Sequence, residues 1–299
     1  DLAKLDFSET VFRYGLPFVI QFGSGWAGNS TFFITTSSEM ELIKKKYFFR
    51  KVKISKLIKG FTVLNNAVIF QDKIIKSLPA LQIKADRILT ANQGGTGGRQ
   101  WPAKISPLQN DKINRITEKI GSLMRQKGYR GFFGLDFLIE EKTGEVYLSE
   151  NNARLTASCP FYTKLELAKG IFPLVGYHLL SFLNNQPKKV VEIPKMDEIK
   201  GSEIVARNTN DYPVEAADEL KPGIFDKNLQ LKKETYYLES FSNEDFWLTT
   251  AGCGRKINPE IEIIRINTFA EVCDDTGVLK NNYLKIIQDI RRLLKLKKC

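Results

Sequence analysis

Two carboxylates and a carboxamide could together bind a metal ion: Asp136, Glu150 and Asn152. Residues two apart in a strand share one face, so Glu150 and Asn152 point the same way. Asp136 belongs to the other arm of a predicted hairpin, which brings it beside them. These groups make the hard, all-oxygen surroundings that Mg²⁺ prefers, usually completed by phosphate oxygens and water. The cluster therefore predicts a site for Mg²⁺, or for Mn²⁺ in its place.

Arg154 follows the cluster and would lie on the same side if the strand continues. Its planar guanidinium fork fits a phosphate or a carboxylate. An ordinary hairpin with a polar solvent face would have the same spacing. Two details favour a binding site. Residues 151–154 have a poor composition for a strand, and polar groups follow directly after apolar strands on both arms, where binding sites tend to lie.

The N-terminal half that must position this cluster alternates short strands with glycine loops. Residues 17–22 and 31–34 are predicted strands on either side of a glycine loop. Ser37 or Ser38 is predicted to cap a short helix through Lys46, and residues 47–85 alternate apolar and polar residues as strands do. A second glycine loop covers residues 94–98. The clearest helix then begins at Asp111 and ends at Gly128.

The hairpin itself is predicted from two apolar strands, 132–139 and 146–149, joined by a turn at Thr143 and Gly144. Residues 160–184 are predicted to be helical, and residues 184–189 form the best candidate linker. Beyond them, 203–207 and 261–265 are predicted strands, and a final helix runs from about Asn282.

The sequence Glu-Asn-Asn-Ala-Arg at 150–154, preceded by Asp136 and a strand-turn-strand, resembles the metal-binding signature of the ATP-grasp superfamily, of the carboxylate–amine/thiol ligase type. That signature is an acidic residue followed, about a dozen residues later, by Glu-x-Asn-x-Arg. Residues 15–31 resemble the small lid of that superfamily, and residues 54–60 resemble its adenine-binding hinge. The resemblance covers roughly residues 10–185.

The resemblance implies an α+β fold with a small lid at 1–54, a larger core with an antiparallel sheet and the metal site at 55–187, and a C-terminal α+β region at 188–299. It implies ATP and Mg²⁺ as cofactors, Arg154 as the catalytic residue, and Asp136, Glu150 and Asn152 as metal ligands. The residues that it assigns to the nucleotide are Gln21, Gly23, Ser24, Gly25, Gly28, Ile54, Ser55, Lys56, Leu57 and Arg99.

The implied activity is that of an ATP-dependent ligase. ATP passes its γ-phosphoryl group to a substrate carboxylate, and an amine or other nucleophile then displaces phosphate from the acyl phosphate. Such chemistry needs charge neutralisation and positioning, which metals and cationic side chains supply. The partners expected are a small carboxylate and a nucleophile, with a homo-oligomer as an option. The alternative is a regulatory or catalytically degenerate nucleotide-binding module.

The chain departs from the family pattern at three points, of which Gln21 and the expected missing domain favour that alternative. Gln21 stands where these ligases usually have a lysine, and an amide cannot neutralise a phosphate. Trp26 lies in a loop of otherwise small residues. The chain begins with Asp1 near the expected lid, so we expect that a preceding domain, with its own nucleotide-contacting lysine, belongs to the functional unit.

The glycine loop at 94–98 and the Arg99 that follows it have two readings. Backbone N–H groups of glycine-rich turns can bind anions, and Arg99 would add charge, so the segment could close over a substrate or triphosphate. The plain alternative is a flexible loop.

Composition narrows the function classes further. The chain has 299 residues and a net charge of +11, but no nucleic-acid-binding motif accompanies that charge, so we expect no nucleic-acid partner. No apolar run approaches the ~18 residues of a membrane span. Its single histidine, His178, lies in an apolar stretch and is expected to be a packed or surface residue, which argues against histidine-dependent catalysis. Four scattered cysteines are expected to be reduced thiols in a cytoplasmic protein.

Overall fold

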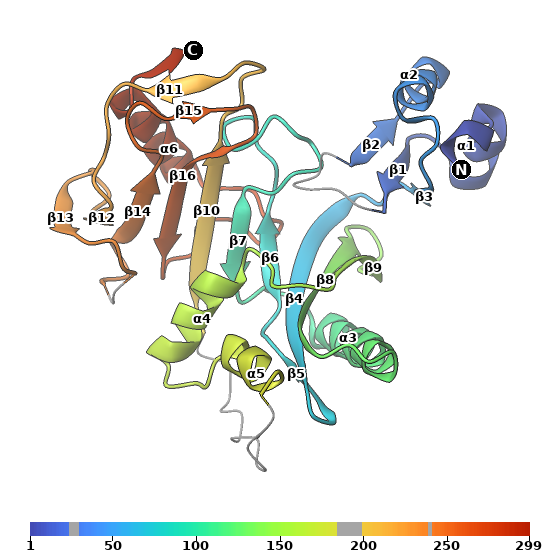
Figure 1. Cartoon of the computed structure of the whole chain (residues 1–299), viewed down its shortest axis with the longest axis horizontal. Helices are drawn as coiled ribbons and strands as arrows, with labels where there is room; N and C mark the ends of the chain where they lie inside the picture. Colours follow the sequence, from blue (N-terminus) through green and yellow to red (C-terminus); the bar gives the residue numbers. More distant parts are fainter. Residues whose placement is uncertain (24–29, 184–198, 239–240) are drawn as a thin grey trace.

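A computed structural model describes residues 1–23, 30–183, 199–238 and 241–299 (Figure 1). In this part of the chain the large sheet has eleven strands in the order β13-β12-β14-β16-β10-β7-β6-β4-β8-β9, with β5 paired to β4. Its neighbouring strands pair antiparallel. The predicted α+β class with an antiparallel sheet is confirmed.

The first lobe, which we call the lid lobe, covers residues 1–56. It contains a three-stranded sheet in the order β2-β1-β3. Buried side chains of the sheet, Phe18, Ile20 and Ile34, pack with Leu2 and Met40 of its helical segments. Its elements are a 3-10 turn (Leu2–Lys4), α1 (Phe7–Tyr14), β1 (Phe18–Phe22), β2 (Thr31–Ile34), α2 (Ser37–Tyr47) and β3 (Val52–Lys56).

The start of α2 corrects the sequence prediction. Thr36, rather than Ser37 or Ser38, caps the helix, and its hydroxyl accepts a hydrogen bond from the backbone N–H of Glu39. The Glu39 carboxylate accepts in return from Thr36 N–H, which completes a capping box. Hydrogen bonds from Thr35 and Thr36 lower the pKa of Glu39. The cap therefore depends on two reciprocal hydrogen bonds between Thr36 and Glu39. A run of hydroxyl residues in the sequence does not reveal which one makes them.

The central part of the large sheet is built on two long strands, β4 and β8, and on helix α3. That helix begins at Pro107 and not at Asp111, because Ser106 caps it and Gln109 closes the capping box. Ile113 of α3 is buried with side chains of β4 and β8. The strands here are β4 (Gly60–Phe70), β5 (Lys73–Lys76), β6 (Ala80–Ile83), β7 (Gly98–Trp101), β8 (Gly131–Glu140) and β9 (Val146–Asn152), and α3 is Pro107–Gln126.

The predicted helix at 160–184 is two helices, α4 (Cys159–Ala168) and α5 (Leu174–Leu180). Gly170 adopts φ +67 and Pro173 precedes α5, so the chain breaks and restarts between them. The predicted linker at 184–189 lies outside the described residues. His178 is packed: its Nδ1 accepts a hydrogen bond of 3.0 Å from Phe132 N–H, and burial lowers its pKa.

Glu166 of α4 is a buried carboxyl group that no cation pairs with in the described ranges. Its oxygens accept from Leu174 N–H at 3.2 Å, and burial raises its pKa to about 8. The ordinary value is about 4.3, so the folded state holds a proton that the unfolded state releases, and stability falls as pH rises from about 4.3 to about 8.

We therefore expect Glu166→Gln to leave stability unchanged near pH 4 and to raise it above pH 8, by on the order of 3 kcal/mol. The amide keeps the acceptor for Leu174 N–H but carries no charge. Urea denaturation of both proteins at pH 5, 7 and 9 measures this. Parallel pH curves would mean that the carboxyl group ionises in the folded protein without cost.

The C-terminal residues continue the large sheet. Strand β10 pairs with β7, and β16 with β10, while a third sheet has the order β15-β11-β17. Helix α6 (Asn281–Leu293) buries Ile286, Ile287 and Ile290 in the core here. The strands are β10 (Gly201–Arg207), β11 (Val214–Ala216), β12 (Gly223–Phe225), β13 (Leu231–Glu234), β14 (Phe246–Thr250), β15 (Lys256–Ile257), β16 (Glu262–Thr268) and β17 (Leu296–Lys298).

Two further expectations concern the whole chain. The four cysteines are free thiols, with Cys159 and Cys273 buried and Cys253 and Cys299 exposed. Among the residues that the structure describes, no helix is long and apolar enough to cross a membrane.

Candidate functional site

The hairpin of β8 and β9 brings the predicted metal ligands together. Asp136 lies directly opposite Glu150, and Gly134 lies opposite Asn152. The register shifts between Asp136 and Phe137, which leaves Ser149 without a partner on β8, as in a β-bulge. Residues that face each other in an antiparallel pair share one face of the sheet. The two carboxylates therefore stand side by side on one face.

The negative charge of Glu150 disfavours ionisation of Asp136. The pKa of Asp136 is raised to about 7: burial and the Glu150 carboxylate raise it, while Arg99 and Arg154 act in the opposite direction. Two neighbouring carboxylates of this kind favour either a shared proton or a divalent cation. Within the described ranges no three His, Cys, Asp or Glu side chains form a metal-binding group. Here the third oxygen would be the Asn152 amide, so the donors fit Mg²⁺ completed by ligand oxygens.

Arg154 lies beyond the end of β9 and folds back onto the hairpin. Its backbone N–H donates to Asn152 O at 2.8 Å, and its guanidinium donates to Asn152 Oδ1 at 3.0 Å and to Leu155 O at 3.1 Å. The strand ends at Asn152, so Arg154 does not continue it, yet its charge reaches Asp136. The guanidinium is exposed and touches the amide oxygen that the metal would need.

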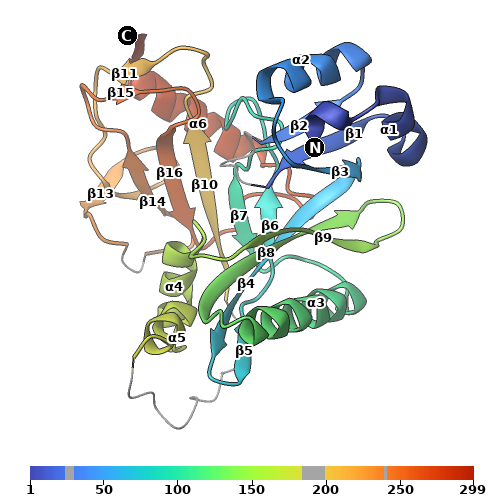
Figure 2. The same ribbon diagram turned by 45° about the vertical axis from the view of Figure 1, so that its right-hand side comes forward.

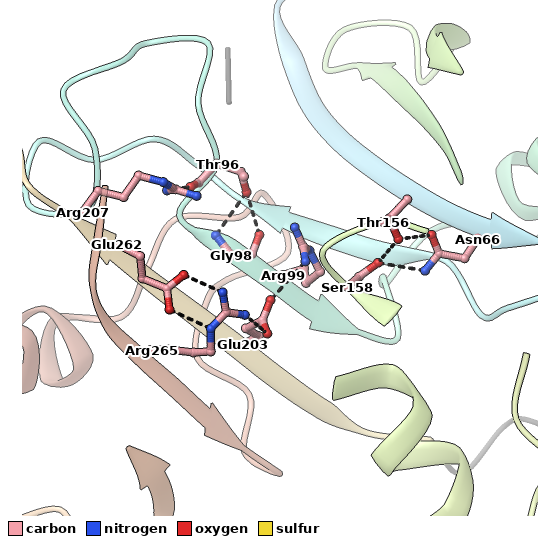
Figure 3. Close-up of polar contacts among 10 residues, drawn as sticks. All are labelled: Asn66, Thr96, Gly98, Arg99, Thr156, Ser158, Glu203, Arg207, Glu262 and Arg265. Atoms are coloured by element: carbon pink, nitrogen blue, oxygen red, sulfur yellow. Dashed lines mark hydrogen bonds and ion pairs between the residues drawn. The ribbon is translucent and has the colours of Figure 1, made fainter. Parts of the chain in front are cut away.

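Arg99 on β7 joins the site from the other side. It ion-pairs with the buried Glu203 of β10 at 3.0 Å, and Glu203 also accepts from Arg265 at 2.6 Å. Figure 3 shows Arg99 between this ionic cluster and a second polar cluster of Asn66, Thr156 and Ser158. Its Nε is buried and has no hydrogen-bond partner in the part of the chain described. Arg99 is therefore held rigidly within electrostatic reach of Asp136.

The second cluster fixes the chain just after Arg154. Asn66 of β4 accepts a hydrogen bond from Thr156 Oγ1 at 3.0 Å and donates to Ser158 Oγ at 2.9 Å. The two hydroxyl groups are 2.7 Å apart (Figure 3). This closed network holds no ionisable group. It anchors the segment that carries Arg154 to the central strand of the sheet.

No protein-family model matches the chain, and no curated protein is similar to it in sequence. Its structure is similar to the biotin carboxylase domain of 2-oxoglutarate carboxylase from Hydrogenobacter thermophilus, solved with MgADP, ADP and bicarbonate. The TM-score is 0.57 at 14% identity, over 88% of this chain and 55% of that one. It is also similar to carboxyaminoimidazole ribonucleotide synthase from Aspergillus clavatus, solved with ATP, with a TM-score of 0.60 at 13% identity, over 98% of this chain and 67% of that one.

A further similar structure is N5-carboxyaminoimidazole ribonucleotide synthetase from Thermotoga maritima, with a TM-score of 0.56 at 15% identity, over 98% of this chain and 66% of that one. The chain has the ATP-grasp fold. It spans between 55% and 67% of the length of these three structures.

In the ATP-grasp fold of this chain, the predicted lid residues fall partly within the described ranges. Gln21 lies on β1, where its Nε2 donates to Thr31 Oγ1 at 3.2 Å, and Gly23 follows the end of that strand. Ser24, Gly25 and Gly28 lie outside the described residues. The lid lobe lies above β8 and β9 (Figure 2).

The predicted hinge is the end of β3 and the turn into β4. Ile54, Ser55 and Lys56 are in β3, and Leu57 follows. At Gly60 a Cβ atom would lie 1.9 Å from Ile139 O, so only glycine lets β4 approach β8 this closely. The glycine after the hinge is therefore a packing requirement of the ATP-grasp sheet in this chain.

The ionic cluster around Glu203 was missed by reasoning from the sequence. A Cβ at Gly98 would lie 1.9 Å from Glu203 O, and this glycine has φ +129, so part of the glycine loop exists to bring β7 against β10. Arg207 of β10 donates to Thr96 O at 2.6 Å, and Arg265 also pairs with Glu262 (Figure 3). The available signal was a glutamate inside an otherwise apolar strand, because such a charge needs a buried partner.

Proposed function

We propose that the chain binds Mg-ATP between the lid lobe and the β8–β9 hairpin and activates a small carboxylate, in the manner of a carbon–nitrogen ligase. The observation that carries the proposal is the direct pairing of Asp136 with Glu150, with Asn152 and Arg154 beside them. The bound nucleotides of the similar structures support the same ligand class.

Each residue has a role that follows from its place. Asp136, Glu150 and Asn152 would hold Mg²⁺, which neutralises and orients the phosphates when bound. Arg154 would leave the Asn152 oxygen to that metal and turn its fork to the γ-phosphate or to the substrate carboxylate. Arg99, fixed by Glu203, would add positive potential without moving.

A second candidate is a nucleotide-binding module without turnover. It is favoured by Gln21, which is neutral and bonded to Thr31, and by the network beyond Arg154, where Asn66, Thr156 and Ser158 provide no ionisable group. Such a chain would bind Mg-ATP and report on it without transferring phosphate.

Isothermal titration with ATP, in Mg²⁺ and in EDTA, tests the binding proposal. We expect binding in Mg²⁺ and its loss in EDTA, because without metal the two carboxylates repel the triphosphate. ADP release is then followed with a panel of small carboxylates, starting from bicarbonate. Acid-dependent ADP release supports a ligase, and metal-dependent binding with no release under any acid supports the module. Equal titrations with and without Mg²⁺ would contradict both.

A further inference from the structure

A row of three side chains crosses the lid sheet. Gln21 at the centre of the row lies opposite Thr31 on β2 and opposite Lys53 on β3. Side chains at directly opposed positions lie on the same face, with Cβ atoms about 4.5–5.5 Å apart. The row is therefore polar from end to end and ends in a cation.

This row faces the hairpin rather than the lid helices. Phe18 and Ile20 of β1 are fully buried in the lid core, and Ile54 of β3 packs there as well. Because successive strand residues point to opposite faces, Gln21 and Lys53 turn away from that core. Lys53 Nζ confirms the direction, since it donates to Ser149 O at 2.8 Å.

The contact falls beside the proposed metal site. Ser149 is the residue that the β9 bulge leaves out of the ladder, so its carbonyl is available to Lys53, and the next residue is Glu150. Lys53 is exposed and forms no ion pair within the described ranges. A bond from an ammonium to one neutral carbonyl is weaker than a bond to a charged oxygen, so the ammonium would exchange Ser149 O for a phosphate oxygen.

We propose that Lys53 is the lid cation that contacts the phosphates of the bound nucleotide, with Gln21 and Thr31 as its neutral neighbours. The inference rests on the proposed Mg-ATP site and adds a residue to it. Lys53 starts one strand away from Gln21 on the same face, and its flexible stem carries a compact charge across that distance. Lys53 then supplies the positive charge of the lid that the neutral Gln21 cannot supply.

Four variants test the assignment by titration with Mg-ATP. Lys53→Met removes the charge and should weaken binding by about tenfold or more, the scale of a hydrogen bond to a charged group. Lys53→Arg should keep most of the affinity. The double variant Gln21→Lys with Lys53→Gln moves the cation across the strand pair and should also restore affinity. Lys45→Met removes an exposed lysine from α2 of the same lobe and should bind like the wild type.

Thermal melts without nucleotide keep the comparison fair, and all four variants should unfold within a few degrees of the wild type. Gln21→Lys alone should leave affinity equal or tighter, because it adds a second cation to the row. If Lys53→Met, folded, binds Mg-ATP like Lys45→Met, the Lys53 assignment is wrong while the nucleotide site stands. If the wild type itself does not bind Mg-ATP, the proposed function has failed instead.

Discussion

Replacing Glu150 by glutamine should lower phosphate transfer at least about a hundredfold and weaken Mg-ATP binding, while the melting temperature stays where it was. The amide keeps the size of the side chain but takes away the charge that faces Asp136. Glu150 is exposed on β9 and does not pack in the core, so its replacement should not unfold the protein. Titration with Mg-ATP, ADP release and a thermal melt of one preparation measure the three parts together.

Glu141→Gln is the matched control, since Glu141 is an exposed glutamate of the same hairpin near its turn. It should behave like the wild type in all three measurements. Unchanged Mg-ATP affinity and turnover in Glu150→Gln and in Asn152→Ala would return the hairpin to an ordinary polar turn. Most of the case for ATP would go with it.

Asp136→Asn should move two quantities in opposite directions. Without metal it should stabilise the fold above pH 7, by on the order of 1 kcal/mol, because an amide replaces a half-buried carboxylate beside Glu150. With Mg²⁺ and ATP present it should lose binding, because a ligand charge is gone. A structural aspartate would give the reverse pattern: lower stability of the variant and intact binding.

The pH dependence follows from the same residue. The pKa of Asp136 is raised to about 7, so below that pH the carboxyl group holds a proton that Mg²⁺ must displace. Wild-type Mg-ATP affinity should therefore fall as pH drops from 8 to 6, by up to about tenfold per unit below pH 7, and any residual binding by Asp136→Asn should not follow this slope. Metal-free wild type should lose stability as pH rises from about 4 to about 7.

Local pattern sufficed to predict the hairpin. The apolar runs on either side of Thr143 and Gly144 fix both strands, and the period of two places Glu150 and Asn152 on one face. The turn alone would place Ser149 opposite Asp136, because Phe137 pairs with Leu148. The bulge at Ser149, which the apolar pattern did not predict, shifts the register by one residue and brings Glu150 opposite Asp136.

The long-range contacts of the site could not be predicted from the sequence. Lys53 and Ser149 are far apart in the chain, and only the packing of the lid lobe against the hairpin brings them together. Arg99 was singled out for its place after a glycine loop, but its partner Glu203 required the pairing of β7 with β10. The predicted first residues of α2 and α3 were wrong, and the observed N-caps are Thr36 and Ser106. Several hydroxyl and acidic residues in a row can each begin a helix, so the sequence did not identify the cap.

The pairing of β7 with β10 also determines where the chain can be truncated. Four backbone positions, from Gly98 to Trp101, are bonded to the strand that opens the C-terminal residues. Cutting the chain before β10 would turn a central strand into a raw edge, with unpaired N–H and C=O groups and a fully buried Trp101 beside it. Such an edge is a template for joining another chain. A fragment that ends before β10 would thus tend to aggregate, and the C-terminal third prevents this association by covering β7.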